Sequence, residues 1–127
     1  LIMHWALDNG TWSSTSQEVD KLVDAINRGD TSITLENYGT FDLSGVVGKI
    51  PVILSGHEHQ DNAKTLSSGV SHVVTTCDAG RLQYHEETTY VKGTTSEQAL
   101  DVFIIDFDKK EIDDLRIGRG SDRKFNF

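Results

Sequence analysis

A chain of 127 residues has the length of a single domain, and folding at this size buries roughly two-thirds of the surface of the unfolded chain. Hydrophobic residues make up 36% and charged residues 25%, which is typical of a globular protein and excludes a disordered one. The net charge of −8 argues against a nucleic-acid partner, because nonspecific nucleic-acid binding needs Lys and Arg to neutralise phosphates.

The sequence also indicates a compartment. Cys77 is the only cysteine, which excludes an internal disulfide and favours a reducing environment. No apolar stretch approaches the roughly 20 residues that span a bilayer, and the start of the chain has no signal-peptide pattern. We therefore expect a cytoplasmic protein without a membrane partner.

The amino-terminal part predicts a strand and then a helix. Leu1–Trp5 is a short apolar strand with His4 near its carboxyl end. Because this opening is typical of a core strand and lacks an initiator Met, we expect the chain to be the carboxy-terminal piece of a longer protein. Thr15 and Glu18 fit a capping box that begins a helix. The apolar face of this helix is expected to cover a sheet, and it consists of Val19, Leu22, Val23 and Ile26.

The rest of the chain predicts connectors and five further strands. Gly29 ends the helix, and residues 30–48 are expected to form an ordered connector with little regular structure. We expect a polar turn at residues 60–64 and a loop or irregular hairpin at residues 81–96. Leu100–Phe107 is apolar at alternate positions on both faces, which favours burial on both faces. The five strands are Lys49–Ser55, Val70–Thr76, Leu100–Phe107, Ile112–Ile117 and Lys124–Phe127, the last of them an edge strand.

These elements predict an α+β fold with about six strands and one clear helix. We find no internal repeat and no low-complexity linker, so residues 1–127 are expected to form a single unit.

Metal-binding chemistry is concentrated where one predicted strand ends, at Ser55-Gly56-His57-Glu58-His59. Gly56 allows a sharp turn, and residues i and i+2 of an extended chain face the same side with Cα atoms about 6.6 Å apart. That separation would place one imidazole on each of two metal ions held about 3.5–4 Å apart. His4 occupies a comparable place at the end of its own strand. The alternatives are a solvated turn with two incidental histidines, and a His4 that packs beside Trp5.

The order of these histidines resembles the calcineurin-like metallophosphoesterase family. In that family a lone histidine follows a strand, and the motif Gly-His-x-His comes later, as His4 and Gly56-His57-Glu58-His59 do here. The resemblance covers nearly the whole chain and extends to a bacterial or phage-type subgroup. The further matching segments are Phe41-Asp42-Leu43-Ser44-Gly45, Gly93-Thr94-Thr95-Ser96-Glu97, Leu100-Asp101-Val102 and Arg116-Ile117-Gly118-Arg119-Gly120-Ser121-Asp122-Arg123.

The resemblance implies a β-sandwich flanked by helices, of which this chain is the carboxy-terminal half. It implies hydrolysis of phosphate mono- or diesters by two divalent metal ions, with Mn, Fe, Zn and Ni as suitable metals. His4 and His57 would bind one ion and His59 its neighbour. The family's Asp-x-His, Gly-Asp-x-x-Asp and Gly-Asn-His-Asp/Glu motifs are absent. We therefore expect the isolated chain to be inactive until a missing amino-terminal half completes the site.

Other polar residues have simpler explanations. Glu58, Asp61 and Asn62 are expected to form the turn, and the alternative is a role beside the metal ligands or on the substrate. His72 is expected on a sheet face and His85 in a loop. The arginines are suited to binding phosphate, but interleaved aspartates favour local ion pairs; these residues are Arg116, Arg119, Arg123, Asp113, Asp114 and Asp122.

A rival hypothesis belongs to another functional class. The chain would then be a noncatalytic β-rich binding or assembly module that keeps its histidines as a relic or as a mononuclear site. Half of a sandwich exposes an apolar surface, so we expect self-association through strand edges or the exposed core face.

Overall fold

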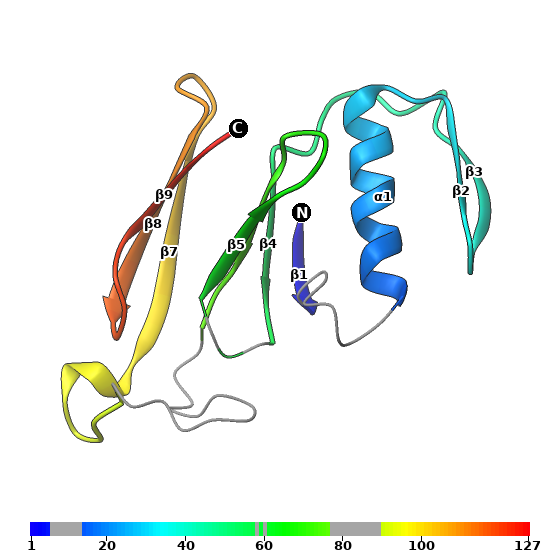
Figure 1. The fold of residues 1–127 in the computed structure, drawn as a ribbon. Helices are drawn as coiled ribbons and strands as arrows, with labels where there is room; N and C mark the ends of the chain where they lie inside the picture. The colour runs from blue at the N-terminus through cyan, green and yellow to red at the C-terminus, as the bar shows by residue number, and fades with distance from the viewer. Residues whose placement is uncertain (6–13, 58, 60, 77–89) are drawn as a thin grey trace.

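The computed structural model describes residues 1–5, 14–57, 59, 61–76 and 90–127 (Figure 1). Within these residues the chain is an α+β protein with one α-helix, one short 3-10 helix and nine strands in three small sheets. The elements are β1 (Ile2–Trp5), α1 (Ser14–Arg28), β2 (Ser32–Leu35), β3 (Gly39–Asp42), β4 (Val52–Gly56), β5 (Asn62–Thr65), β6 (Ser71–Val74), η1 (Thr95–Glu97), β7 (Ala99–Asp106), β8 (Glu111–Gly118) and β9 (Arg123–Asn126). The α+β class is confirmed.

All six predicted strands are present, and three described strands were not predicted. β2 and β3 form an antiparallel hairpin where we expected a connector, and β5 begins in the segment expected to be a polar turn. β3 is exposed along its whole length, and β5 nearly so. Exposed strands are held by backbone hydrogen bonds and carry no apolar alternation, which is why their sequence gave no strand signal.

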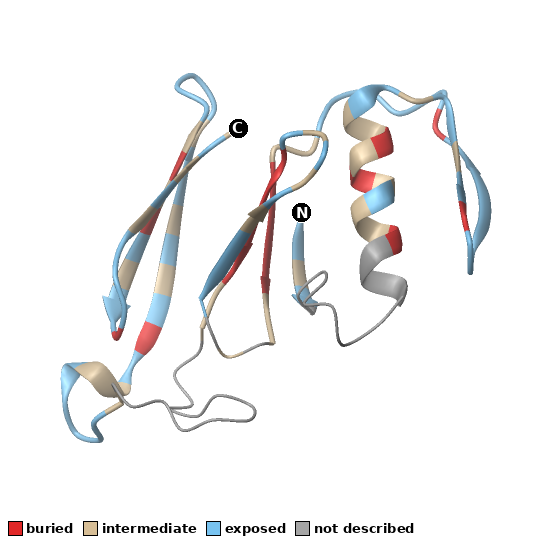
Figure 2. Cartoon of the chain, viewed as in Figure 1, coloured by how far each residue is buried: buried red, intermediate tan, exposed pale blue. Residues whose placement is uncertain are grey.

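The central sheet has the order β1-β4-β6-β5, in which β1, β4 and β6 are parallel and β5 is antiparallel. Val52 to Ser55 of β4 and all of β6 are buried, as expected for strands covered on both faces (Figure 2). In Figure 1, α1 lies on one side of this sheet and the β7–β9 sheet on the other.

Two apolar clusters hold these layers together. On the helix side, Val23 of α1 packs with Ile53 and Val70. On the other side, Ile112 of β8 packs with buried side chains of the central sheet, which are Val52, Leu54 and Val73. The prediction that the helix covers a sheet is therefore confirmed. β4 contributes alternate residues to both clusters, so it is the strand around which the layers are built.

The start of α1 differs from the predicted capping box. The helix includes Ser14, so Thr15 lies inside it and not at its cap. The Glu18 side chain binds Asn37. Its Oε1 accepts one hydrogen bond from the Asn37 backbone N at 3.0 Å and one from the Asn37 Nδ2 at 3.1 Å. Glu18 is 2% exposed and ties the helix to the β2–β3 turn. The predicted end is confirmed, because Gly29 adopts φ +79° directly after Arg28.

The prediction that Leu100–Phe107 is buried on both faces is wrong. Leu100, Val102 and Ile104 of β7 are exposed, and Leu100 is exposed by 60%. The antiparallel register pairs Leu100 with Ile117 and Val102 with Leu115, which are also exposed. Only the opposite face, with Phe103, packs on the central sheet. An apolar run is buried on both faces only where other elements cover both faces of its sheet. No described element covers the outer face of β7.

Candidate functional site

Two of the predicted metal ligands meet at the carboxyl edge of the central sheet. β1 and β4 run parallel, with Trp5 in register with Gly56, so their carboxyl ends lie side by side. His4 is the penultimate residue of β1, and His57 is the first residue after β4. In open sheets with parallel strands this edge is where ligand sites form.

The two rings are in contact. Nδ1 of His57 lies 3.0 Å from Nε2 of His4, and the ring centroids are 4.9 Å apart with an interplanar angle of 76°. Two nitrogens that each lie about 2.1 Å from one ion are about 3.0 Å apart at the 90° angle of an octahedral site and about 3.4 Å apart at the angle of a tetrahedral one. The spacing also fits a hydrogen bond in which one neutral ring donates N–H to the other. The donor set therefore fits part of the coordination shell of one metal ion.

The backbone at this edge is not extended. His57 has φ +72° and His59 has φ +54°. Both values lie in the left-handed region, which residues other than glycine seldom adopt. The expectation of extended spacing between the two histidines is thus wrong, because the chain turns at both positions. A non-glycine residue in this region costs about 1–3 kcal/mol, and such strain gathers at functional sites.

The described residues do not assemble a third ligand beside this pair. Within the described ranges, which omit Glu58 and Gln60, no group of three or more His, Cys, Asp or Glu side chains is placed to hold a metal ion. The carbonyl of His59 accepts a hydrogen bond from Oγ1 of Thr76 at 3.0 Å, which connects the histidine segment to the residues after β6.

Of the three predicted turn residues, Asp61 has the most extensive contacts. Its carboxylate accepts hydrogen bonds from Nη1 and Nη2 of Arg116 at 2.9 and 2.7 Å, and from the backbone N of Thr76 at 3.1 Å. Burial raises the pKa of Asp61, but these bonds and the charge of Arg123 outweigh it and hold the pKa below its usual value. Asn62 begins β5, and its Oδ1 accepts a hydrogen bond from the Ala63 amide. Glu58 lies outside the described residues.

The expected local ion pairs of the arginines are only partly present. Arg123 does pair with a nearby aspartate, Asp114, at 2.7 Å. Arg116 instead binds Asp61 and Asp101, of which Asp61 is far away in the sequence. Arg119 lies buried with its guanidinium donating to the Ser96 carbonyl at 3.0 Å. The sequence has no signal for the contact between Arg116 and Asp61, because 55 positions separate the two residues.

His72 is not part of this site. His72 is buried on β6, and its Nε2 lies 2.7 Å from Oγ of Ser55, so it is a residue of the sheet interior. His85 is outside the described residues.

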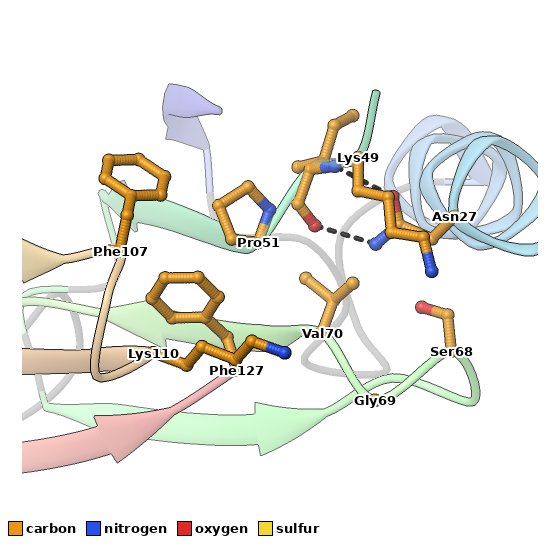
Figure 3. Close-up of a pocket in the computed structure, with 10 residues that line it drawn as sticks. Asn27, Lys49, Pro51, Ser68, Gly69, Val70, Phe107, Lys110 and Phe127 are labelled. Atoms are coloured by element: carbon orange, nitrogen blue, oxygen red, sulfur yellow. Dashed lines mark hydrogen bonds between the residues drawn. The ribbon is translucent and has the colours of Figure 1, made fainter. Parts of the chain in front are cut away.

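A pocket of about 360 Å³ opens at the opposite end of β4 (Figure 3). It begins at Pro51, before β4, whereas His57 follows that strand, so the length of β4, about 16 Å, separates the pocket from the histidine pair. Asn27, labelled in Figure 3, lines this pocket and bridges to the backbone of Ile50: its Nδ2 donates to the Ile50 carbonyl at 2.7 Å, and its Oδ1 accepts from the Ile50 amide at 2.8 Å. The pocket is therefore distinct from the candidate metal site.

No described helix is long and apolar enough to cross a membrane. Comparison of the chain with protein-family models, with curated proteins and with solved structures gave no match.

Proposed function

We propose that this chain is the carboxy-terminal half of a cytoplasmic, metal-dependent phosphoesterase, with a sandwich of two sheets beside a helix. The observation that carries the proposal is the 3.0 Å approach of His4 and His57 at the carboxyl edge of two parallel strands. These residues would hold one divalent ion, and His59 would bind its neighbour from the same turn. The packing of the central sheet on the β7–β9 sheet supports the sandwich.

The chain's own residues would hold the metals. Two imidazoles at the carboxyl ends of neighbouring strands suit borderline ions such as Mn, Fe, Zn or Ni. Bound in a pair, such ions supply a hydroxide nucleophile and stabilise charge on a phosphate ester. The described residues offer only part of a dinuclear ligand set, and in this proposal a missing amino-terminal half supplies the other ligands.

A Co²⁺ titration of this chain tests the histidine pair. We expect His4→Ala and His57→Ala each to weaken Co²⁺ binding at least about tenfold, because each removes half of the paired donor set. His72→Gln, which removes a histidine buried in the sheet interior, is the matched control and should bind as the wild type does. Equal affinity in all four proteins would show that the pair is not a metal site.

Hydrolysis of bis-p-nitrophenyl phosphate tests the reaction. This chain alone should show no metal-dependent turnover, and the protein that also contains the amino-terminal half should show turnover that His57→Ala removes. Strong turnover by this chain alone would refute the proposed division of ligands. A complete protein that binds metal but hydrolyses neither phosphate monoesters nor diesters would refute the enzyme.

One observation favours the second candidate, a noncatalytic assembly module. The outer face of the β7–β8 pair carries five exposed apolar side chains, and contiguous apolar patches of this kind mark contact surfaces. They are Leu100, Val102, Ile104, Leu115 and Ile117. This candidate predicts self-association that Val102→Lys abolishes and His57→Ala leaves intact, measured by light scattering.

A further inference from the structure

The turn that carries the histidines is fastened to the second sheet through Arg116, whose two hydrogen bonds to Asp61 are shorter than the 3.4 Å approach of Arg123 to the same carboxylate. Arg116 of β8 reaches across to Asp61, which lies two positions after His59 and just before β5. Each guanidinium Nη atom donates to a different oxygen of the Asp61 carboxylate. Two parallel hydrogen bonds of this kind fix the orientation of the carboxylate as well as its distance from the arginine. The segment from His57 to Asp61 is thus held by β4 at one end and by Arg116 at the other.

A hydrogen-bond path leads from this ion pair to His59. Asp61 accepts the Thr76 amide at 3.1 Å, and the Thr76 hydroxyl donates to the His59 carbonyl at 3.0 Å. His59 has φ +54°, a conformation that persists only where its surroundings fix it. The contacts of Asp61 and Thr76 are surroundings of that kind.

The arginine is itself held rigidly. Its side chain is 2% exposed, and besides Asp61 it bonds Asp101 through Nε and Nη2 and the Arg119 carbonyl through Nη1 at 2.6 Å. Opposite charge therefore faces the guanidinium from both sheets, and the hydrogen bonds to Asp61 and Asp101 raise the pKa of Arg116 despite its burial.

The backbone beside it is adapted to the same contact. Gly120 has φ +107°, and a Cβ at this position would overlap Nη1 of Arg116. A side chain at position 120 would therefore displace the guanidinium from Asp61. This observation is independent of the hydrogen bonds and points to the same arrangement.

We propose that Arg116 is a positioning residue of the metal site: it fixes Asp61, and through Asp61 and Thr76 it sets the backbone of the histidine turn. This inference rests on the proposed function, because positioning matters only if the histidines bind metal. A lysine cannot replace the arginine, since one ammonium does not offer the two parallel donors that Asp61 accepts.

The test compares three variants of this chain with the wild type. Arg116→Lys keeps the charge and removes the two-bond contact, and Asp61→Asn leaves Arg116 paired with Asp101. Asp20→Asn is the matched control, because it weakens a partly buried ion pair outside this cluster, that between α1 and Lys64 of β5, and leaves the contact between Arg116 and Asp61 in place. Each protein is measured for Co²⁺ affinity, for hydrogen exchange of the Thr76 amide without metal, and for urea stability.

We expect Arg116→Lys and Asp61→Asn to weaken Co²⁺ binding about tenfold and to speed exchange at Thr76, since residues that orient ligands typically cost 10–100-fold in metal affinity, about tenfold at the low end. The double variant should be no weaker than Asp61→Asn alone. Asp20→Asn should lower stability and leave Co²⁺ affinity within about twofold. If Arg116→Lys does not fold, Asp61→Asn carries the same test.

The outcomes separate the two proposals. If the wild type binds Co²⁺ through His57 and Arg116→Lys binds equally well, Arg116 only joins the sheets and this inference fails alone. If the wild type binds no Co²⁺, the proposed function fails and the metal-positioning role fails with it. The Thr76 exchange then still shows whether Arg116 holds the turn.

Discussion

The left-handed backbone at His57 allows strain to be separated from chemistry. We compare His57→Gly with His57→Ala. Both variants remove the imidazole, so both should lose metal affinity equally. They differ in backbone preference, because glycine adopts φ +72° freely and alanine does not. The stability difference between the two variants therefore measures the cost of the backbone conformation alone.

The expected magnitude follows from two opposing effects. An L-residue in the left-handed region costs about 1–2 kcal/mol relative to glycine. Glycine gives back about 0.4–1 kcal/mol, because it makes the unfolded chain more flexible. His57→Gly should therefore be more stable than His57→Ala by about 0.5–1 kcal/mol. With an m value of about 2 kcal/mol/M, its urea midpoint should be higher by about 0.4 M.

A control pair at an ordinary helical position should show the opposite sign. Lys21 is exposed within α1, where Lys21→Gly should be less stable than Lys21→Ala by about 1 kcal/mol. If alanine at position 57 proves as stable as glycine while the helical pair behaves as expected, the strained turn at His57 is refuted.

Three further predictions concern the framework of the site. Gly118→Ala should destabilise the chain by more than about 2 kcal/mol in urea unfolding, because its Cβ would overlap the Gln98 carbonyl at φ +97°, whereas Gly93→Ala, with open space around it, should cost about 1 kcal/mol. Asn27→Ala should cost about 2–3 kcal/mol, since two hydrogen bonds to the Ile50 backbone are lost, and an equal stability would contradict that bridge. Burial raises the pKa of Asp24, but hydrogen bonds from Ser67 and Ser68 outweigh it and lower the pKa, so this contribution to stability is present above about pH 4 and lost as pH falls through the lowered pKa. Ser67→Ala should thus be less stable than the wild type at about pH 6, and the difference should narrow as pH falls through the lowered pKa; a difference that is the same at every pH would refute the linkage.

The sequence was sufficient to predict those elements whose burial shows in the spacing of their apolar residues. β4 and β6 are continuous apolar runs because both of their faces are covered, and α1 shows its single apolar face at helical spacing. β3 and β5 could not be predicted in the same way, since exposed strands are specified by backbone pairing with a neighbour.

The candidate site was predictable as chemistry and not as geometry. The motif indicates which histidines are candidate ligands. Only the parallel pairing of β1 with β4 shows that His4 lies beside His57. The left-handed turns at His57 and His59 contradict propensity, because tertiary contacts outweigh local preference there. The contact between Arg116 and Asp61 depends on how two sheets pack, which no local pattern records.

Under the proposed function, an amino-terminal half would bring its metal ligands to the edge of the central sheet at β1. β1 is the outermost strand next to β4, and Ile2 on it is 83% exposed. A parallel strand added to β1 would bury Ile2 and bring its carboxyl end beside His4, so one addition would extend both the sheet and the metal site. Ile2→Lys should then prevent the amino-terminal half from restoring phosphoesterase activity, because the lysine charge opposes burial at this edge. The variant chain should keep its Co²⁺ affinity, because position 2 is not part of the histidine pair. Full activity of Ile2→Lys in the complete protein would place the missing ligands at another edge.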